Sequence, residues 1–183
     1  MKFNEFYSLT IVHSRDIILV KGVDYMNITK QKSQKTFDKQ AADYDTNIQG
    51  EHARKLYKPI IENLKNKNIH SILDLGCGTG ALLKEIKELN IAEQLFGIDI
   101  SPNMLEIAKN KLGNDATLIL GDSERLPFED SSFDAIVCND SFHHYPQPDI
   151  VEKEVSRCLK QNGVFIIGDC WQPIGARQIM NYY

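Results

Sequence analysis

The residues with the clearest chemical potential lie between Ile72 and Gly80, where the chain reads Ile-Leu-Asp-Leu-Gly-Cys-Gly-Thr-Gly. Three glycines alternate with small residues after an apolar run, and Asp74 lies two residues before the first of them. Glycine adopts backbone conformations closed to other residues and lets a ligand approach the main chain. A phosphate-binding loop favours positive charge and free amides, whereas a carboxylate suits a ligand with a cationic portion. The pattern predicts a buried strand, a ligand-binding turn and a helix over 81–89.

A second acid, Asp99, stands at the end of the next apolar run, about twenty residues beyond the glycine turn. A carboxylate at this place accepts hydrogen bonds from both hydroxyls of a ribose, which is the role of an acid at the end of the second strand in nucleotide-binding sheets. A helix cap or a surface acid is the alternative. Taken with the glycine turn, Asp99 favours a nucleoside ligand.

From His70 onward, the chain has the pattern of strands and helices that would position these groups. Apolar runs alternate with amphipathic segments, in the rhythm of a parallel sheet that helices cover on both faces. The runs are nearly continuous, as in strands buried on both faces. Right-handed crossovers would place a ligand outside the carboxyl ends of the strands. The expected strands are 71–75, 94–100, 116–120, 133–139 and 164–169, and the expected helices are 81–89, 102–112 with Ser101 as its cap, and 149–159 closed by Gln161-Asn162-Gly163.

The sequence divides into three parts: an atypical leader (1–25), amino-terminal helices on the substrate side (26–69) and the α/β core (70–183). Helices are expected over 33–44 and 52–64. The leader lacks clear periodicity, and its last residues can be encoded by a purine-rich ribosome-binding sequence before a start codon at Met26. We therefore expect translation to begin at Met26. The alternative is an extra strand over 16–20.

Composition narrows the possible partners and location. The 183 residues carry a net charge of −4, which gives no general electrostatic reason to bind nucleic acid. No apolar run reaches membrane-spanning length. Four widely spaced cysteines without a C-x-x-C pair favour a reducing, cytoplasmic location, and no residues at ligand spacing predict a zinc or other metal site. The cysteines are Cys77, Cys138, Cys158 and Cys170.

Four segments together resemble class I S-adenosylmethionine-dependent methyltransferases. Asp74 with the three glycines resembles the first motif of that family, acid-x-Gly-x-Gly-x-Gly. Residues 121–128 resemble its adenine-binding turn, and 132–146 resemble its fourth strand and the aromatic and histidine segment that follows. Residues 37–45 resemble the amino-terminal segment of methyltransferases that act on quinones, sterols and other small molecules. The four segments occur in the order that the family shows.

The resemblance implies a role for each candidate residue. The glycine turn and Asp74 would hold the amino-acid end of S-adenosylmethionine, Asp122 would accept from the adenine amino group, and the Ser123 amide would meet a ring nitrogen. Ile100 and Met104 would flank the adenine, although both also suit a core, and Tyr44 would belong to a lid or to a core stripe with Phe37. The expected cofactor-binding residues are Asp74, Gly76, Cys77, Gly78, Gly80, Asp99, Ile100, Met104, Asp122, Ser123, Asn139 and Tyr44.

His143 and His144 are the candidates for acid–base chemistry, because imidazole titrates near neutral pH. One of them would remove a proton from the methyl acceptor; the alternatives are lining the substrate pocket or packing the turn. Methyl transfer depends mainly on orientation and desolvation, because the sulfonium methyl is already electrophilic.

The predicted protein is a doubly wound α/β domain, a Rossmann-like methyltransferase fold shortened after its fifth strand, that methylates a small molecule. The last strand, 164–169, is then expected to be an open edge covered by a partner chain or a second copy. One alternative is a shortened chain that binds cofactor or a partner without independent catalysis. The other is an NAD-dependent oxidoreductase.

Overall fold

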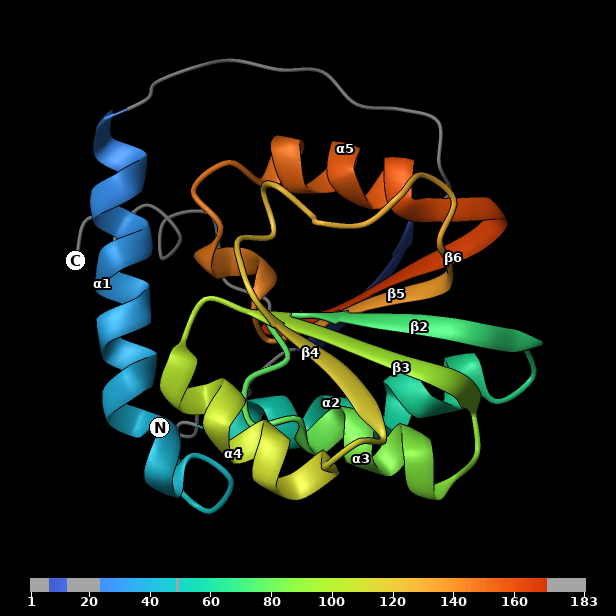
Figure 1. The fold of residues 1–183 in the computed structure, drawn as a ribbon, viewed down its shortest axis with the longest axis horizontal. Helices are drawn as coiled ribbons and strands as arrows, with labels where there is room; N and C mark the ends of the chain where they lie inside the picture. Colours follow the sequence, from blue (N-terminus) through green and yellow to red (C-terminus); the bar gives the residue numbers. More distant parts are fainter. Residues whose placement is uncertain (1–6, 13–23, 49, 171–183) are drawn as a thin grey trace.

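The computed structural model describes residues 7–12, 24–48 and 50–170, which form one six-stranded sheet with helices on both faces (Figure 1). The strands are Tyr7–Val12 (β1), Ile69–Leu75 (β2), Ala92–Asp99 (β3), Ala116–Leu120 (β4), Phe133–Asn139 (β5) and Leu159–Cys170 (β6). The helices are Asp24–Gln40 (α1), Glu51–Leu64 (α2), Ala81–Glu88 (α3), Pro102–Leu112 (α4) and Pro148–Cys158 (α5), with short 3-10 turns at Ala41–Asp43 (η1) and Phe142–His144 (η2).

The sheet confirms the predicted doubly wound architecture. Its strand order is β1-β6-β5-β2-β3-β4, and the neighbouring strands from β6 to β4 are parallel. The parallel part of the sheet therefore starts at the central strand β2, moves outward through β3 and β4, and then crosses to β5 and β6 on the other side. This reversal creates a crevice at the carboxyl ends of β2 and β5, where such sheets bind ligands.

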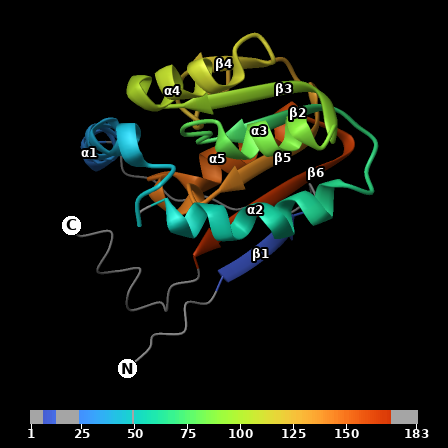
Figure 2. The same ribbon diagram turned by 90° about the horizontal axis from the view of Figure 1, so that it is seen from below.

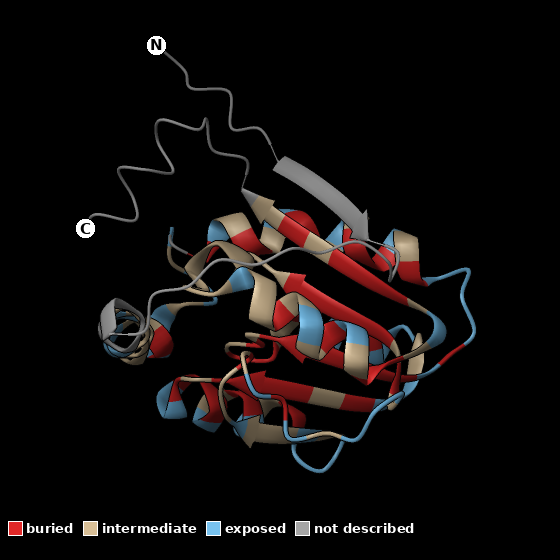
Figure 3. Cartoon of the chain, turned by 90° about the horizontal axis from the view of Figure 1, so that it is seen from above, coloured by how far each residue is buried: buried red, intermediate tan, exposed pale blue. Residues whose placement is uncertain are grey.

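Two apolar layers hold the helices against the sheet. One face of the sheet packs against α2, α3 and α4 through buried leucines and isoleucines such as Ile60, Leu83 and Leu105. The other face packs against α5 through Val151 and Val155. In Figure 1 these three helices lie below the strands and α5 lies above them, and in the view from below α1 stands to one side of the sheet (Figure 2). The central strands β2 and β5 are almost wholly buried, as their continuous apolar runs predict, whereas β4 at the edge is not (Figure 3).

One predicted boundary is wrong. Residues Gln161-Asn162-Gly163 were expected to end the last helix, but α5 ends at Cys158 and β6 begins at once with Leu159. Leu159 pairs with Phe133, and the ladder is irregular between Phe133 and Ala135. The strand absorbs its polar residues at this irregularity, where Asn162 has a φ of +69°. Pairing with a buried strand thus overrides the local preference of Asn-Gly for a turn.

The edge of β6 is also not open as expected. Strand β1 pairs antiparallel with β6 along its whole length, from Tyr7 opposite Cys170 to Val12 opposite Phe165. This pairing removes the reason for expecting a partner chain or a second copy at that edge. The strand expected over 16–20 falls outside the described residues, so the leader contributes its described strand nearer the amino terminus. Helix α1 begins at Asp24 and runs across the expected boundary at Met26.

Candidate active site

The glycine turn between β2 and α3 forms the floor of the site. All three glycines have positive φ angles, which L-residues adopt only with strain. The amides of Gly76 and Cys77 both donate to the Ile98 carbonyl, at 2.9 and 3.1 Å, and this ties the turn to the neighbouring strand. A side chain at position 76 has no room, because an added Cβ would lie 2.1 Å from the hydroxyl of Ser141. The turn is therefore built for close approach of backbone and ligand.

Asp99 connects this turn to the next helix. One of its carboxylate oxygens accepts from the Gly78 amide and the other from the Ser101 amide, both at 2.8 Å. Ser101 caps α4 as predicted, since its hydroxyl accepts from the Met104 amide at 3.1 Å. Burial raises the pKa of the Asp99 carboxyl, and these amide donors act against that rise. The carboxylate is thus held in place at the crevice, with further lone pairs available to hydroxyl donors.

Asp74 is the least satisfied polar group of the site. Its side chain is 2% exposed, and its Oδ1 atom has no hydrogen-bond partner within the described ranges. Burial raises the pKa of this carboxyl well above its usual range, and the nearby Asp99 carboxylate raises it further. Burying such a group without a partner is costly. A ligand with a hydrogen-bond donor would satisfy the Asp74 carboxylate, and a positively charged donor would do so best.

The loop after β4 forms the opposite wall. Asp122 and Glu124 both bind the ammonium of Lys30 from α1, which lies 2.6 Å from the Asp122 carboxylate. The Ser123 hydroxyl contacts the Tyr145 hydroxyl at 3.2 Å. The same phenol lies 2.9 Å from the Ser141 hydroxyl. A carboxylate beside a backbone amide on this wall has the donor–acceptor pattern that complements adenine.

The end of β5 carries the two candidate histidines, and the structure separates them. His144 lies at the cavity, with its ring centroid 5.1 Å from that of Phe37 in an edge-to-face arrangement. Burial, with a smaller contribution from His143, lowers the pKa of His144 to about 4, so this imidazole is neutral at pH 7. The His143 ring instead hydrogen-bonds Asp169 through Nδ1 at 2.6 Å. Asp140 lies next to this pair. One side-chain nitrogen or oxygen atom from each of Asp140, His143 and Asp169 lies within 4.8 Å of the other two.

The amino-terminal segment closes over the cavity and is fastened to its rim. The Asp38 carboxylate accepts from the Ser101 hydroxyl at 2.6 Å. The Asp45 carboxylate binds Lys111 at 2.7 Å and the Thr79 hydroxyl at 2.5 Å. These contacts reach the loops after β2 and β3 from residues 37–45, the segment that resembles a methyltransferase lid. They place Phe37 and Tyr44 against the cavity, with ring centroids 6.3 Å apart.

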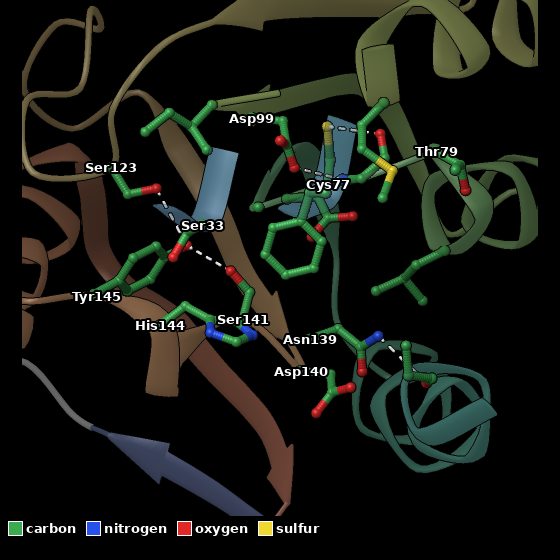
Figure 4. A pocket seen from close by; sticks show the side chains of 18 of the residues that line it. Ser33, Cys77, Thr79, Asp99, Ser123, Asn139, Asp140, Ser141, His144 and Tyr145 are labelled. Carbon is green, nitrogen blue, oxygen red and sulfur yellow. Dashed lines mark hydrogen bonds between the residues drawn. The ribbon is translucent and has the colours of Figure 1, made fainter. Parts of the chain in front are cut away.

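The expected cofactor-binding residues converge on this single cavity, with one exception (Figure 4). Gly80 lies behind the turn as the cap of α3, where its backbone packs against Leu112 and Ala108. His143 is also outside the cavity lining, so of the two histidines only His144 faces the ligand space. The residues named from the sequence that do line it are Asp74, Gly76, Cys77, Gly78, Asp99, Ile100, Met104, Asp122, Ser123, Asn139, Tyr44 and His144.

Several lining residues were not predicted. Lys30 lies outside every motif, and only its charge marks it in the sequence. Tyr57 lies on α2 next to the apolar stripe, where an aromatic residue looks like core. Ser141 and Tyr145 belong to the segment after β5 that resembles the family, but no role could be read for them without the contact between their hydroxyls. Asp140 lacked any signal except its place at a strand end.

A parallel sheet whose glycine turn, acidic strand ends and carboxylate–amide turn share one cavity is the arrangement of a Rossmann-like domain that binds a nucleoside cofactor. Residues 73–167 match the family model described as methyltransferase domain, and the chain belongs to this family. This membership leaves the oxidoreductase alternative without support.

Two curated relatives illustrate the similarity. The sterol 4-C-methyltransferase strm-1 of Caenorhabditis elegans is 35% identical over 125 residues, which cover 65% of this chain and 36% of that protein. The demethylmenaquinone methyltransferase of Thermotoga maritima is 33% identical over 148 residues, which cover 79% of this chain and 64% of that protein. The chain thus spans between about a third and two thirds of the length of these relatives.

Solved structures show the same fold. The YcgJ protein from Bacillus subtilis aligns with a TM-score of 0.61 and 28% identity, covering 67% of this chain and 53% of that one. A structure of a complex between the Haloferax volcanii Trm112 methyltransferase activator and a methyltransferase aligns with a TM-score of 0.62 and 28% identity, covering 72% of this chain and 58% of the other. None of the helices within the described ranges is long and apolar enough to cross a membrane.

Proposed function

We propose that this chain binds S-adenosylmethionine and transfers its methyl group to a small molecule. The observation that carries the proposal is Asp74, a buried carboxylate with an unpaired oxygen in a cavity that also holds Asp99 and Asp122. The cofactor fits this arrangement, because it offers an ammonium, a ribose diol and an adenine amino group along its length. Each of these donors meets a carboxylate of complementary chemistry.

Different residues bind different parts of the cofactor. Asp74 and the glycine turn receive the amino-acid end, together with Asn139 at the end of β5. Asp99 receives the ribose hydroxyls while its two amide contacts hold it still. Asp122 and the Ser123 amide receive the adenine, and Ile100 and Met104 enclose it.

When bound, the cofactor supplies an electrophilic methyl group, so the protein has to position the acceptor and exclude water. Phe37 and Tyr44 serve the second task, because they close the cavity from the amino-terminal side. His144 is neutral at pH 7 and faces the cavity, so it is the histidine placed to accept a hydrogen bond from the acceptor, while its lowered pKa makes it a weak base. His143 does not face the cavity and has a structural role instead, because its hydrogen bond to Asp169 stabilises the η2 turn.

The two curated relatives are named as methyltransferases of a sterol and of demethylmenaquinone. These names support a small molecule as the acceptor of this chain. Cys77, Cys138 and Cys158 are free and buried, which favours a reducing compartment and the cytoplasmic location expected from the sequence.

The test is calorimetric titration with S-adenosylhomocysteine and, separately, with NAD. We expect saturable binding of the first and none of the second. Asp74→Asn should weaken S-adenosylhomocysteine binding about tenfold or more, since a charge-assisted hydrogen bond contributes about 1.5–3 kcal/mol. Asp130→Asn is the matched control, because Asp130 is exposed and pairs with Arg157 away from the cavity.

Absence of S-adenosylhomocysteine binding by the folded wild-type chain would refute the proposal. Binding without methyl transfer to any of a panel of acceptors would support the alternative of a chain that binds cofactor without independent catalysis. Methyl transfer is measured as the release of S-adenosylhomocysteine, so the methylated product does not have to be known.

A further inference from the structure

The acceptor end of the cavity is acidic and aromatic, and we propose that it takes a small molecule with a basic nitrogen, an amine, held by the carboxylate of Asp140. This inference rests on the proposed methyl transfer and names the class of its acceptor. An amine differs from the sterol and the demethylmenaquinone in the names of the two curated relatives.

Asp140 is held in an unusual conformation directly after β5. Its φ angle is +52°, in the left-handed region that non-glycine residues rarely adopt. The conformation is fixed by the hydrogen bond from its amide to the Gly168 carbonyl, at 2.6 Å. Backbone strain of this kind is concentrated at functional sites. The geometry therefore holds one particular side chain at the cavity wall, next to Asn139 (Figure 4).

The carboxylate of Asp140 is not neutralised by a lysine or arginine. Among the side chains that the structure describes, those of residues 29–48 and 50–169, none is a hydrogen-bond or salt-bridge partner of this carboxylate. The charged or titratable groups that act on it are His143, Asp169 and His52, and burial together with Asp169 opposes its charge. A half-buried carboxylate at a cavity wall is unfavourable without a cationic or donor partner. A ligand ammonium supplies that partner.

The neighbouring side chains favour the same ligand. The edge-to-face rings of Phe37 with Tyr44 and of Phe37 with His144 line the cavity beside Asp140. Asp140 is close enough to Tyr44 to contribute, after burial, to raising the pKa of that phenol to about 12. Aromatic rings attract a cation, most strongly where water is excluded. Rings and carboxylate together thus form a site for a positively charged nitrogen with an apolar body.

The one lysine or arginine among the described lining residues lies elsewhere. Lys30 is occupied by Asp122 and Glu124 at the wall assigned to adenine. An acceptor carrying a carboxylate or phosphate would therefore meet Asp140 without a compensating cation. The distribution of charge selects against anionic acceptors and for cationic ones.

The chemical step is balanced with these groups. The amine enters as an ammonium and gives one proton to the Asp140 carboxylate, which frees the nitrogen lone pair. The new nitrogen–carbon bond forms as the carbon–sulfur bond of the sulfonium breaks, and that electron pair remains on sulfur. The positive charge moves from sulfur to the methylated nitrogen. The proton on Asp140 then passes to solvent, and the carboxylate is restored.

The experiment compares amines with alcohols of the same shape. The protein is first saturated with S-adenosylhomocysteine, and its dissociation constant is recorded. 2-Phenylethylamine and 2-phenylethanol, and tryptamine and tryptophol, are then titrated and followed by NMR. We expect each amine to bind at least tenfold more tightly than its alcohol. Asp140→Asn should remove this preference, and Asp130→Asn should keep it.

The fold should tolerate the change at position 140, because asparagine adopts the left-handed conformation much as aspartate does. The wild-type comparison of amine with alcohol needs no variant at all. Equal binding of both partners, no amine binding, or an unchanged preference in Asp140→Asn would each overturn the inference.

Two further outcomes distinguish a failure of the amine proposal from a failure of the proposed methyl transfer. If the wild-type chain does not bind S-adenosylhomocysteine, the proposed function itself fails. If Asp140→Asn weakens S-adenosylmethionine tenfold relative to S-adenosylhomocysteine and leaves the amine preference intact, Asp140 serves the sulfonium charge, and the assignment to the acceptor is wrong.

Discussion

The ammonium of Lys30 in α1 lies 2.6 Å from the carboxylate of Asp122 in the loop after β4. The two residues are 92 positions apart, and their contact joins the amino-terminal segment to the wall that we assign to adenine. Glu124 binds the same ammonium and is almost wholly buried. Lys30 therefore fastens α1, the helix that leads into the lid segment 37–45, while Asp38 and Asp45 fasten the lid segment itself.

Lys30→Met should loosen the lid. The variant loses a partly buried charge network, which we expect to lower the free energy of unfolding by about 1 kcal/mol. Amide hydrogen exchange over residues 29–40 should become faster, because this part of α1 loses its contact with the loop. Lys35→Met is the control, since Lys35 is exposed on the same helix. Equal exchange rates in the two variants would contradict the assignment.

The unpaired carboxylate of Asp74 should make the empty protein less stable as pH rises. Its pKa is raised by burial in the folded chain, whereas the unfolded chain has the ordinary value of about 3.9. Above that value the folded state binds more protons than the unfolded state, so this group lowers stability with increasing pH. Asp74→Asn should flatten the dependence. Chemical unfolding between about pH 5 and pH 8 measures the difference between the two proteins, and parallel curves would refute the prediction.

Two glycines of the same turn should respond differently to alanine. Both have positive φ angles, and an alanine there costs about 1–2 kcal/mol in backbone strain. At Gly76 the new Cβ would also meet the Ser141 side chain, at 2.1 Å from Oγ, which adds about 1–3 kcal/mol of overpacking. At Gly78 the nearest atom is Met104 Sδ at 4.0 Å. Gly76→Ala should therefore have the lower melting temperature, and Gly78→Ala should lose mainly cofactor affinity.

A chain that starts at Met26 should lose the strand that covers β6. The edge of β6 would then present unpaired backbone groups, which promote association. We expect a lower melting temperature and concentration-dependent self-association, measured by sedimentation. A chain lacking only residues 1–6 keeps β1 and serves as the control. Mass spectrometry of the native amino terminus tests separately the start at Met26 that the codon pattern predicts.

The sequence was informative wherever local chemistry and periodicity agree. The glycines after Asp74 require a turn because only they adopt its φ angles without strain, and the apolar run before them requires a buried strand. Ser101 followed by Pro102 predicts the start of α4, and the capping bond from the Met104 amide confirms it. The sequence was misleading at Asn162-Gly163, where residues typical of a turn lie inside strand β6. There the pairing of Leu159 with Phe133, distant in sequence, decides the structure.

By itself the sequence determined the order of strands and helices from β2 to β6, the family and about half of the residues at the cavity, because each depends on short-range patterns. Only the tertiary structure decided which histidine faces the ligand, that Lys30 reaches Asp122, and that Asp140 stands at the cavity without a partner. These facts depend on contacts between segments tens of residues apart, and on which buried groups find a partner once the chain has folded. Neither spacing nor composition records them.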